Sequence, residues 1–262
     1  LQPACCAEIG GRHTIVVSRH RDTAMILSDP TARVRSRGYK VEAHLGEGPA
    51  ADLWNNALSM MDPPEHGRVR RCLAKDFTRR QIESLRPLVV DVVRQTLAEA
   101  AADEIDVVRL ISVQIPMKVI CRLIGIPESD WLKLETWTAD FLKIFMPHIA
   151  TVDELEAVNG ASRNFIEYFS DLIERKRANP GNDLTSAMAR LEGTAGNLGR
   201  IEIVGALRGL LTAGFETTAA TLSATVLAYA RYPAEFDKIR NGSVSVSHAI
   251  EELLRWESPV QA

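Results

Sequence analysis

LLTAGFETTAATLS, residues 210–223, decides the fold, because it sets an acid and several hydroxyls inside a long helical pattern. Helical periodicity extends from Ile201 to about Tyr232, which corresponds to roughly 30 residues and a length of about 45 Å. A helix of that length crosses an entire domain. The stretch therefore predicts a mainly α-helical protein built around one central helix.

One face of this predicted helix is small and polar. Ala213, Glu216, Thr217 and Ala220 share it by helical spacing, and Gly214 lowers helix stability by about 1 kcal/mol relative to alanine. In one interpretation the small residues admit a flat ligand, to which Glu216 and Thr217 relay protons. In the other, Ala213 and Gly214 admit a crossing helix, the Thr217 hydroxyl bonds to the carbonyl four residues earlier, and Glu216 is solvated.

Composition sets further limits. The 262 residues are 46% hydrophobic, enough for a substantial core, and we expect a single domain over 1–262. A net charge of −3 provides no positive field for nucleic acid or for a membrane surface. The chain lacks a membrane-length apolar run and a signal-peptide pattern near its first residues, so we expect a cytoplasmic protein.

Outside the central helix, the pattern predicts one small β element and many helices. EIGGRHTIVVS, residues 8–18, reads as a hairpin turning at Gly10-Gly11. Residues 31–57 lack steady periodicity and read as loop with short helical pieces. We expect helices at about 20–28, 62–80, 80–101, 112–124, 128–145, 153–178, 183–191, 200–231 and 247–256.

The segment MMDPPEHGRVRRCLAKDFT, residues 60–78, carries a helix start signal. Asp62 can be the N-cap, Pro63 suits the first helical position, and Glu65 stands at the third. A helix is therefore predicted to begin there.

Two residues of that helix can act together on a ligand. His66 and Arg70 are four residues apart, lie on one face and can grip an anion such as a carboxylate. A charged run of this kind is also typical of a solvated helix face. The basic residues continue through Arg68, Arg71, Lys75, Arg79 and Arg80.

A third segment, HAIEELLRWESPVQ, residues 248–261, contains an ExxR spacing. Glu252 and Arg255 can pair across one helical turn, which in an exposed position contributes only about 0.3–0.5 kcal/mol.

Taken in order, these three segments resemble the cytochrome P450 family, specifically its soluble bacterial haem-thiolate monooxygenases. The first resembles the centre of the family's long distal helix, the second its haem-propionate helix, and the third its ExxR helix. LIGIPESD and DLIERKRANPGNDLTSAM add to a resemblance that spans nearly the whole chain. It implies a mainly α fold that is incomplete on its C-terminal side.

The resemblance also implies roles for individual residues. His66 and Arg70 would bind the propionates of haem b, while Ala213 and Gly214 would make room for the haem face and dioxygen. Thr217 would hydrogen-bond the bound oxygen, and Glu216 would pass protons to it. Glu252 and Arg255 would form a structural ion pair.

The implied activity is hydroxylation, or a related oxidation, of a small organic substrate with O2 and two electrons from a ferredoxin or flavodoxin. By position in the family, residues 35–60 form the substrate-contacting loop, and Phe141 to His148 part of the roof. The substrate candidates within that loop are Asn55, Asn56, Leu58 and Met61.

The family's haem-thiolate loop does not occur in this sequence, which stops at Ala262. None of Cys5, Cys6, Cys72 and Cys121 stands in that motif or in a zinc-binding CxxC spacing, so no metal ligand is predicted in this chain. We expect a truncated part of a monooxygenase that neither catalyses alone nor stays monomeric. A haem-free scaffold or activator of a partner enzyme is the alternative, followed by an unrelated helical binding module.

Overall fold

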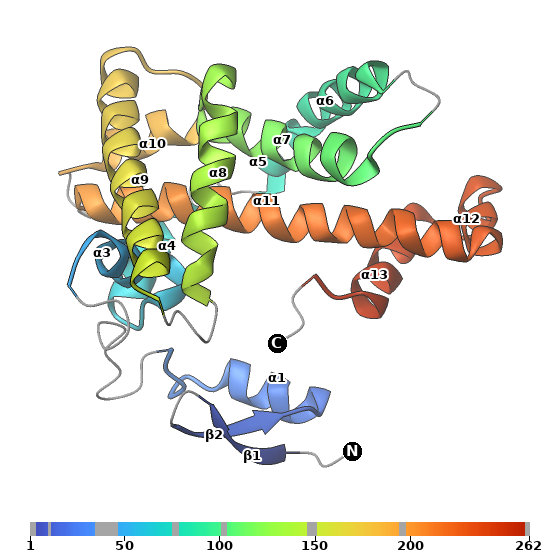
Figure 1. Ribbon diagram of the computed structural model, residues 1–262, viewed down its shortest axis with the longest axis horizontal. Helices are drawn as coiled ribbons and strands as arrows, with labels where there is room; N and C mark the ends of the chain where they lie inside the picture. The colour runs from blue at the N-terminus through green and yellow to red at the C-terminus, as the bar shows by residue number, and fades with distance from the viewer. Residues whose placement is uncertain are drawn as a thin grey trace.

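One long helix runs through the molecule, and shorter helices pack around its first half (Figure 1). The computed structural model describes residues 4–9, 12–34, 47–74, 79–100, 104–145, 151–193 and 198–259. Its elements are β1 (Ala4–Ile9), β2 (Arg12–Val17), α1 (His20–Ser28), α3 (Pro49–Asn55), η1 (Leu58–Met60), α4 (Glu65–Ala74), α5 (Arg79–Ser84), α6 (Arg86–Glu99), η2 (Val108–Val113), α7 (Gln114–Ile124), η3 (Glu128–Asp130), α8 (Trp131–Leu142), η4 (Lys143–Phe145), α9 (Val152–Ala178), α10 (Leu184–Leu191), α11 (Arg200–Arg231), α12 (Pro233–Arg240) and α13 (Val246–Trp256).

The predicted hairpin is confirmed. Strands β1 and β2 pair antiparallel, with Ile9 opposite Arg12, so that two residues separate the paired ends. Those two residues, Gly10 and Gly11, lie outside the described part. The hairpin and α1 lie at one side of the helical body (Figure 1).

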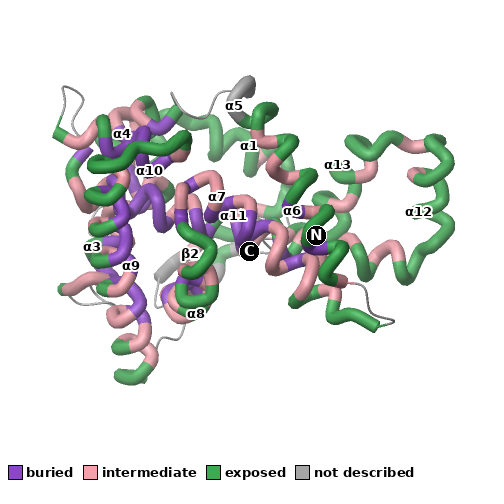
Figure 2. Tube along the Cα trace, turned by 90° about the horizontal axis from the view of Figure 1, so that it is seen from above, coloured by how far each residue is buried: buried purple, intermediate pink, exposed green. Residues whose placement is uncertain are grey.

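Helix α11 is the central helix expected from residues 200–231, and its two halves differ in environment. Leu207, Leu211 and Phe215 on its first half are buried against the surrounding helices, among them α7, α9 and α3. Its second half extends away from this core, as the green segments beyond it show (Figure 2). The Glu202 side chain accepts a hydrogen bond of 2.8 Å from the Gly199 amide and caps the first turn.

Aromatic side chains pack between α8 and α9. Phe165 of α9 contacts Phe141 and Trp137 of α8 edge to face, with ring centroids 6.3 and 5.7 Å apart. Phe169 stacks on Phe165 one turn later. Aromatic pairs in these geometries add about 0.5–1.5 kcal/mol each beyond their buried area, so they fix α8 firmly on α9.

The start of α4 differs from the prediction. The helix begins at Glu65, because Pro64 disfavours helical backbone angles at Pro63. The His66 amide donates to the Asp62 carbonyl, while the Asp62 carboxylate accepts a hydrogen bond from the Val34 amide at 2.9 Å.

Other boundaries also differ. Residues 75–78 of the predicted 62–80 helix lie outside the described ranges, and the predicted 80–101 helix is divided into α5 and α6, with Pro87 in the first turn of α6. The predicted loop at 31–57 contains α3, a short helix of the expected kind. A π-helical segment, η2, precedes α7. The short helix α12 had no prediction, and none of its residues is buried.

The region formed by α12 and α13 exposes much apolar surface. Val246 and Trp256 are 62% and 58% exposed, and no residue of α13 is buried. The whole chain has an accessible surface of 16777 Å². A compact monomer of 28.9 kDa has roughly 11,400 Å². Part of the extra surface belongs to α12 and α13, in which no residue is buried.

Candidate functional site

The middle of α11 presents an open face of small residues. Ala213 and Ala220 on this face are exposed. On the opposite side of the helix at this level, Phe215 and Ala219 are buried in the core. The Thr217 hydroxyl donates a hydrogen bond of 2.7 Å to the Ala213 carbonyl. This bond was expected in the structural interpretation of the stretch, and it leaves the oxygen lone pairs of Thr217 as acceptors.

Gly214 lies toward α7. A Cβ atom placed on Gly214 would lie 3.0 Å from Cδ1 of Ile120 on α7, so the glycine permits a close helix crossing. Of the two interpretations, room for a flat ligand fits Ala213, and room for a crossing helix fits Gly214. Ala213 belongs to the open face, whereas Gly214 serves the packing of α7 on α11.

Glu216 occupies the edge of the open face and is half-buried. Burial raises the pKa of its carboxyl group, and the negative charge of Glu135 on α8 raises this pKa further. Glu216 therefore holds a proton at higher pH than an exposed glutamate. One interpretation of the sequence placed the Glu216 side chain in solvent, but the residue is only partly exposed.

On α4, His66 is half-buried and Arg70 is exposed. The sequence pattern was typical of a solvated face for the intervening Arg68, but this side chain is paired. Its guanidinium forms an ion pair with Glu202 in the first turn of α11, including a hydrogen bond of 3.2 Å to Oε2. This ion pair ties α4 to the start of α11 and had no signal in the sequence, because the partners are far apart in the chain.

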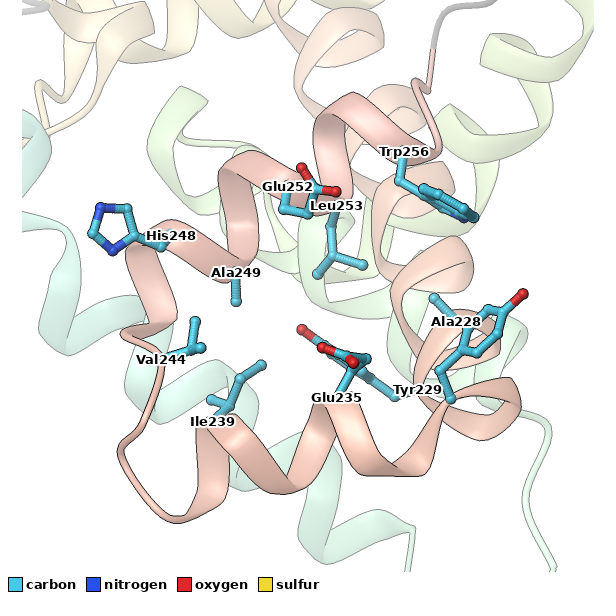
Figure 3. A pocket seen from close by; sticks show the side chains of 11 residues that line it. Ala228, Tyr229, Glu235, Ile239, Val244, His248, Ala249, Glu252, Leu253 and Trp256 are labelled. Carbon is cyan, nitrogen blue, oxygen red and sulfur yellow. The ribbon is translucent and has the colours of Figure 1, made fainter.

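Glu252 and Arg255 form the predicted ion pair on α13. Arg255 Nε donates to Glu252 Oε2 at 2.7 Å, and both side chains are more than half exposed. Beside them lies an apolar groove of about 550 Å³ between the end of α11, α12 and α13 (Figure 3). Its walls include Tyr229, Ile239 and Leu253. This groove lies at the C-terminal end of α11, away from the open face at Ala213.

The predicted substrate residues divide into two groups. Asn55 and Asn56 are half-buried, and the Asn56 carbonyl lies against Gly205 of α11. Leu58 and Met61 pack into the core, so they support this segment from inside. Of the predicted roof, Phe141 is fully buried, whereas residues 146–150 lie outside the described ranges.

Arg208 is a buried cation that the sequence analysis did not single out. Its guanidinium carbon lies 4.3 Å from the ring centroid of Phe141, and its side chain is 5% exposed. Desolvation lowers the pKa of Arg208 to about 10, so it remains charged at neutral pH. The only signal in the sequence was an arginine within the apolar run of α11.

The described cysteine side chains do not form a metal site. Cys6 is exposed, Cys72 is half-buried and Cys121 is buried, and burial raises the pKa of the Cys121 thiol to about 12. Within the described ranges no group of three or more histidine, cysteine or acidic side chains is placed to hold a metal ion.

Comparison with known proteins finds a matching family model and several relatives. The family model described as cytochrome P450 matches residues 1–253. Cytochrome P450 BJ-3 of Bradyrhizobium diazoefficiens is 34% identical over 217 residues, which cover 80% of this chain and 50% of the relative. Mycinamicin IV hydroxylase/epoxidase of Micromonospora griseorubida is 30% identical over 250 residues, or 94% of this chain and 60% of the relative.

The fold has equally clear counterparts. The structure of P450BioI in complex with hexadec-9Z-enoic acid ligated acyl carrier protein matches 99% of this chain and 66% of its own, with a TM-score of 0.90 and 25% identity. The chain thus spans about half to two thirds of the length of these proteins. None of the described helices is long and apolar enough to cross a membrane. These matches contradict the alternative of an unrelated helical binding module.

Proposed function

Because the chain belongs to the cytochrome P450 family, we propose that it contributes the oxygen-binding side of a haem monooxygenase that oxidises a small organic substrate. The observation that carries this proposal is the open face at Ala213, with Thr217 and Glu216 beside it. Hydroxylase and epoxidase activity in the name of the Micromonospora griseorubida relative supports the same reaction class.

The family implies haem, and the described residues fit one side of that cofactor. A flat ring needs small side chains, which Ala213 and Ala220 provide on an exposed face of a helix that is otherwise buried at this level. His66 and Arg70 would hold its propionates, because they are the cationic or hydrogen-bonding groups on one face of α4. No described cysteine matches the thiolate that binds the iron in this family.

When bound, haem b would activate dioxygen for the oxidation. The reaction uses two electrons, for which a ferredoxin or flavodoxin is the expected donor. The protein's own part is to supply hydrogen bonds and protons next to that site. Thr217 has its proton committed to the Ala213 carbonyl, so its oxygen accepts a hydrogen bond from a protonated ligand on the open face. Glu216, whose pKa is raised by burial, is suited to deliver protons there.

A matched pair of threonines tests this proposal. Thr221 makes the same type of bond as Thr217, from its hydroxyl to the carbonyl four residues earlier, at 2.9 Å. In a form of the protein that turns over, Thr217→Ala should divert electrons from product to hydrogen peroxide, whereas Thr221→Ala should leave the ratio of product to consumed reductant unchanged. Equal coupling in both variants would remove Thr217 from the reaction.

The cofactor itself is tested by absorption spectroscopy of a purified form of the protein that includes an iron-binding cysteine. A Soret band that shifts with carbon monoxide in the manner of thiolate-ligated haem supports the monooxygenase. A preparation reconstituted with haem that shows no such band would contradict the proposal and would favour a haem-free scaffold of the same fold.

A further inference from the structure

A cluster of buried polar groups without partners lies where α8 crosses α11. The two helices pass across each other in Figure 1, and the contact of Arg208 with Phe141 joins them. Within the described part of the chain, Nε of Arg208 has no hydrogen-bond partner, and the same holds for Oγ1 of Thr212 and Oγ1 of Thr138. Each of these residues is at least nine-tenths buried. Most buried polar atoms in proteins are paired, so their occurrence together requires an explanation.

Helical spacing brings these three groups to the same contact. Thr212 follows Arg208 by one turn of α11, and Thr138 precedes Phe141 by one turn of α8. Glu216, one turn beyond Thr212, also interacts electrostatically with Glu135 of α8. The two hydroxyls therefore each lie within one helical turn of the contact between Arg208 and Phe141.

The contact with Phe141 does not by itself explain the arginine. A cation above an aromatic ring is stabilised by the negative face of the ring, but the ring provides no acceptor for the in-plane N–H groups of the guanidinium. A buried charge without a counter-charge is costly, and no ion pair to Arg208 occurs among the described residues. An anion at this position would satisfy both requirements.

From these observations we infer that the α8–α11 crossing binds the carboxylate of an apolar substrate, with Arg208, Thr212 and Thr138 as its partners. A carboxylate suits the site because its two oxygens match the fork of one guanidinium and retain lone pairs for two hydroxyls. One cation also balances one negative charge, whereas a phosphate dianion would need another. The inference names the substrate class of the proposed oxidation and rests on that proposal.

The path from this site to the open face follows Gly209. This glycine is half-buried, has no atom within 4 Å of the position of a Cβ, and precedes Ala213 by one turn on the same side of α11. Arg208 and Thr217 are separated by about 13.5 Å along the helix axis. A substrate anchored at Arg208 would therefore be oxidised at a carbon remote from its carboxylate.

Calorimetric titration with a matched pair of probes tests the site without turnover. Dodecanoate and dodecan-1-ol share an alkyl chain and differ in charge. The unmodified protein should bind dodecanoate at least about tenfold more tightly, the lower range for charge-assisted hydrogen bonds. Arg208→Met should abolish this preference, and Arg208→Lys should keep part of it. Arg190→Met, at an exposed arginine of α10, is the control and should retain the full preference.

A second variant covers the case in which Arg208→Met does not fold, which circular dichroism would reveal. Thr212→Val keeps the shape of the side chain and should weaken dodecanoate about threefold to tenfold, with little effect on dodecan-1-ol. Equal binding of the two probes by the unmodified protein would overturn the inference, as would a preference that survives both Arg208→Met and Thr212→Val. Because binding is measured without oxidation, such results would leave the carbon monoxide spectrum as an independent test of the monooxygenase.

Discussion

Two glycines of α11, Gly205 and Gly209, should respond in opposite ways to the same substitution. Alanine is favoured over glycine inside a helix by about 1 kcal/mol, so both changes gain that amount from propensity. At Gly209 the new methyl group meets no atom within 4 Å, and the variant should gain close to the full 1 kcal/mol. At Gly205 the methyl group would lie 2.5 Å from the carbonyl oxygen of Asn56 and 3.0 Å from its carbonyl carbon.

The obstacle at Gly205 is backbone, so it cannot rotate away as a side chain can. Overpacking of a closed site costs about 1–3 kcal/mol, and an overlap of this size belongs near the upper limit. Gly205→Ala should therefore lose about 2 kcal/mol after the gain in propensity. For a chain of this size, that corresponds to a melting temperature lower by about 4–8 °C, against a rise of about 2–4 °C for Gly209→Ala.

Circular dichroism, recorded during heating in the same buffer, measures the melting temperature of both variants. The displaced segment carries Asn55 and Asn56, two of the substrate candidates, so Gly205→Ala should also weaken substrate binding while Gly209→Ala leaves the fold around it intact. If both variants shift the melting temperature in the same direction, the close approach of the Asn56 carbonyl to α11 does not occur in solution.

Three further predictions concern charges. Glu216 has a raised pKa in the folded state, so stability should fall as pH rises from about 4.5 through that pKa; Glu216→Gln should remove this part of a pH-dependent melting curve. Arg68→Met and Glu202→Gln should each destabilise the protein, and a double-mutant cycle should give a coupling of about 0.5–1 kcal/mol, whereas additive effects would mean that α4 and α11 are not joined by this pair. The joint change of His66→Ala and Arg70→Ala should accelerate haem loss in the loaded protein without unfolding α4, as measured by transfer of haem to apomyoglobin; an unchanged rate would leave both residues as a solvated face.

Much of the helical framework could be predicted because its signals are local. The hairpin at Gly10-Gly11 and the span of α11 follow from turn residues and periodicity, which act within a few residues of the chain. The first helical residue of α4 was predicted at Pro63 and lies two residues later at Glu65, because two adjacent prolines gave conflicting signals.

The site was predicted less completely, since its missing parts depend on distant partners. The role of Gly214 in helix packing depends on Ile120, which no local pattern connects to it. Arg68 looked like one cation of a solvated run until its partner Glu202 was placed beside it. The only local signal for Arg208 was its place in an apolar run, because burial of a charge is a property of the assembled helices.

The extended end formed by the second half of α11 with α12 and α13 has a consequence for unfolding by urea. An unfolded chain of 28.9 kDa exposes about 42,000 Å², so unfolding from 16777 Å² uncovers about a sixth less surface than unfolding from a compact monomer of the same mass. The slope of the unfolding free energy against urea concentration, and the heat capacity of unfolding, both scale with that newly exposed surface. Both should be about a sixth smaller than for a compact 262-residue domain, so the urea transition should be correspondingly broader.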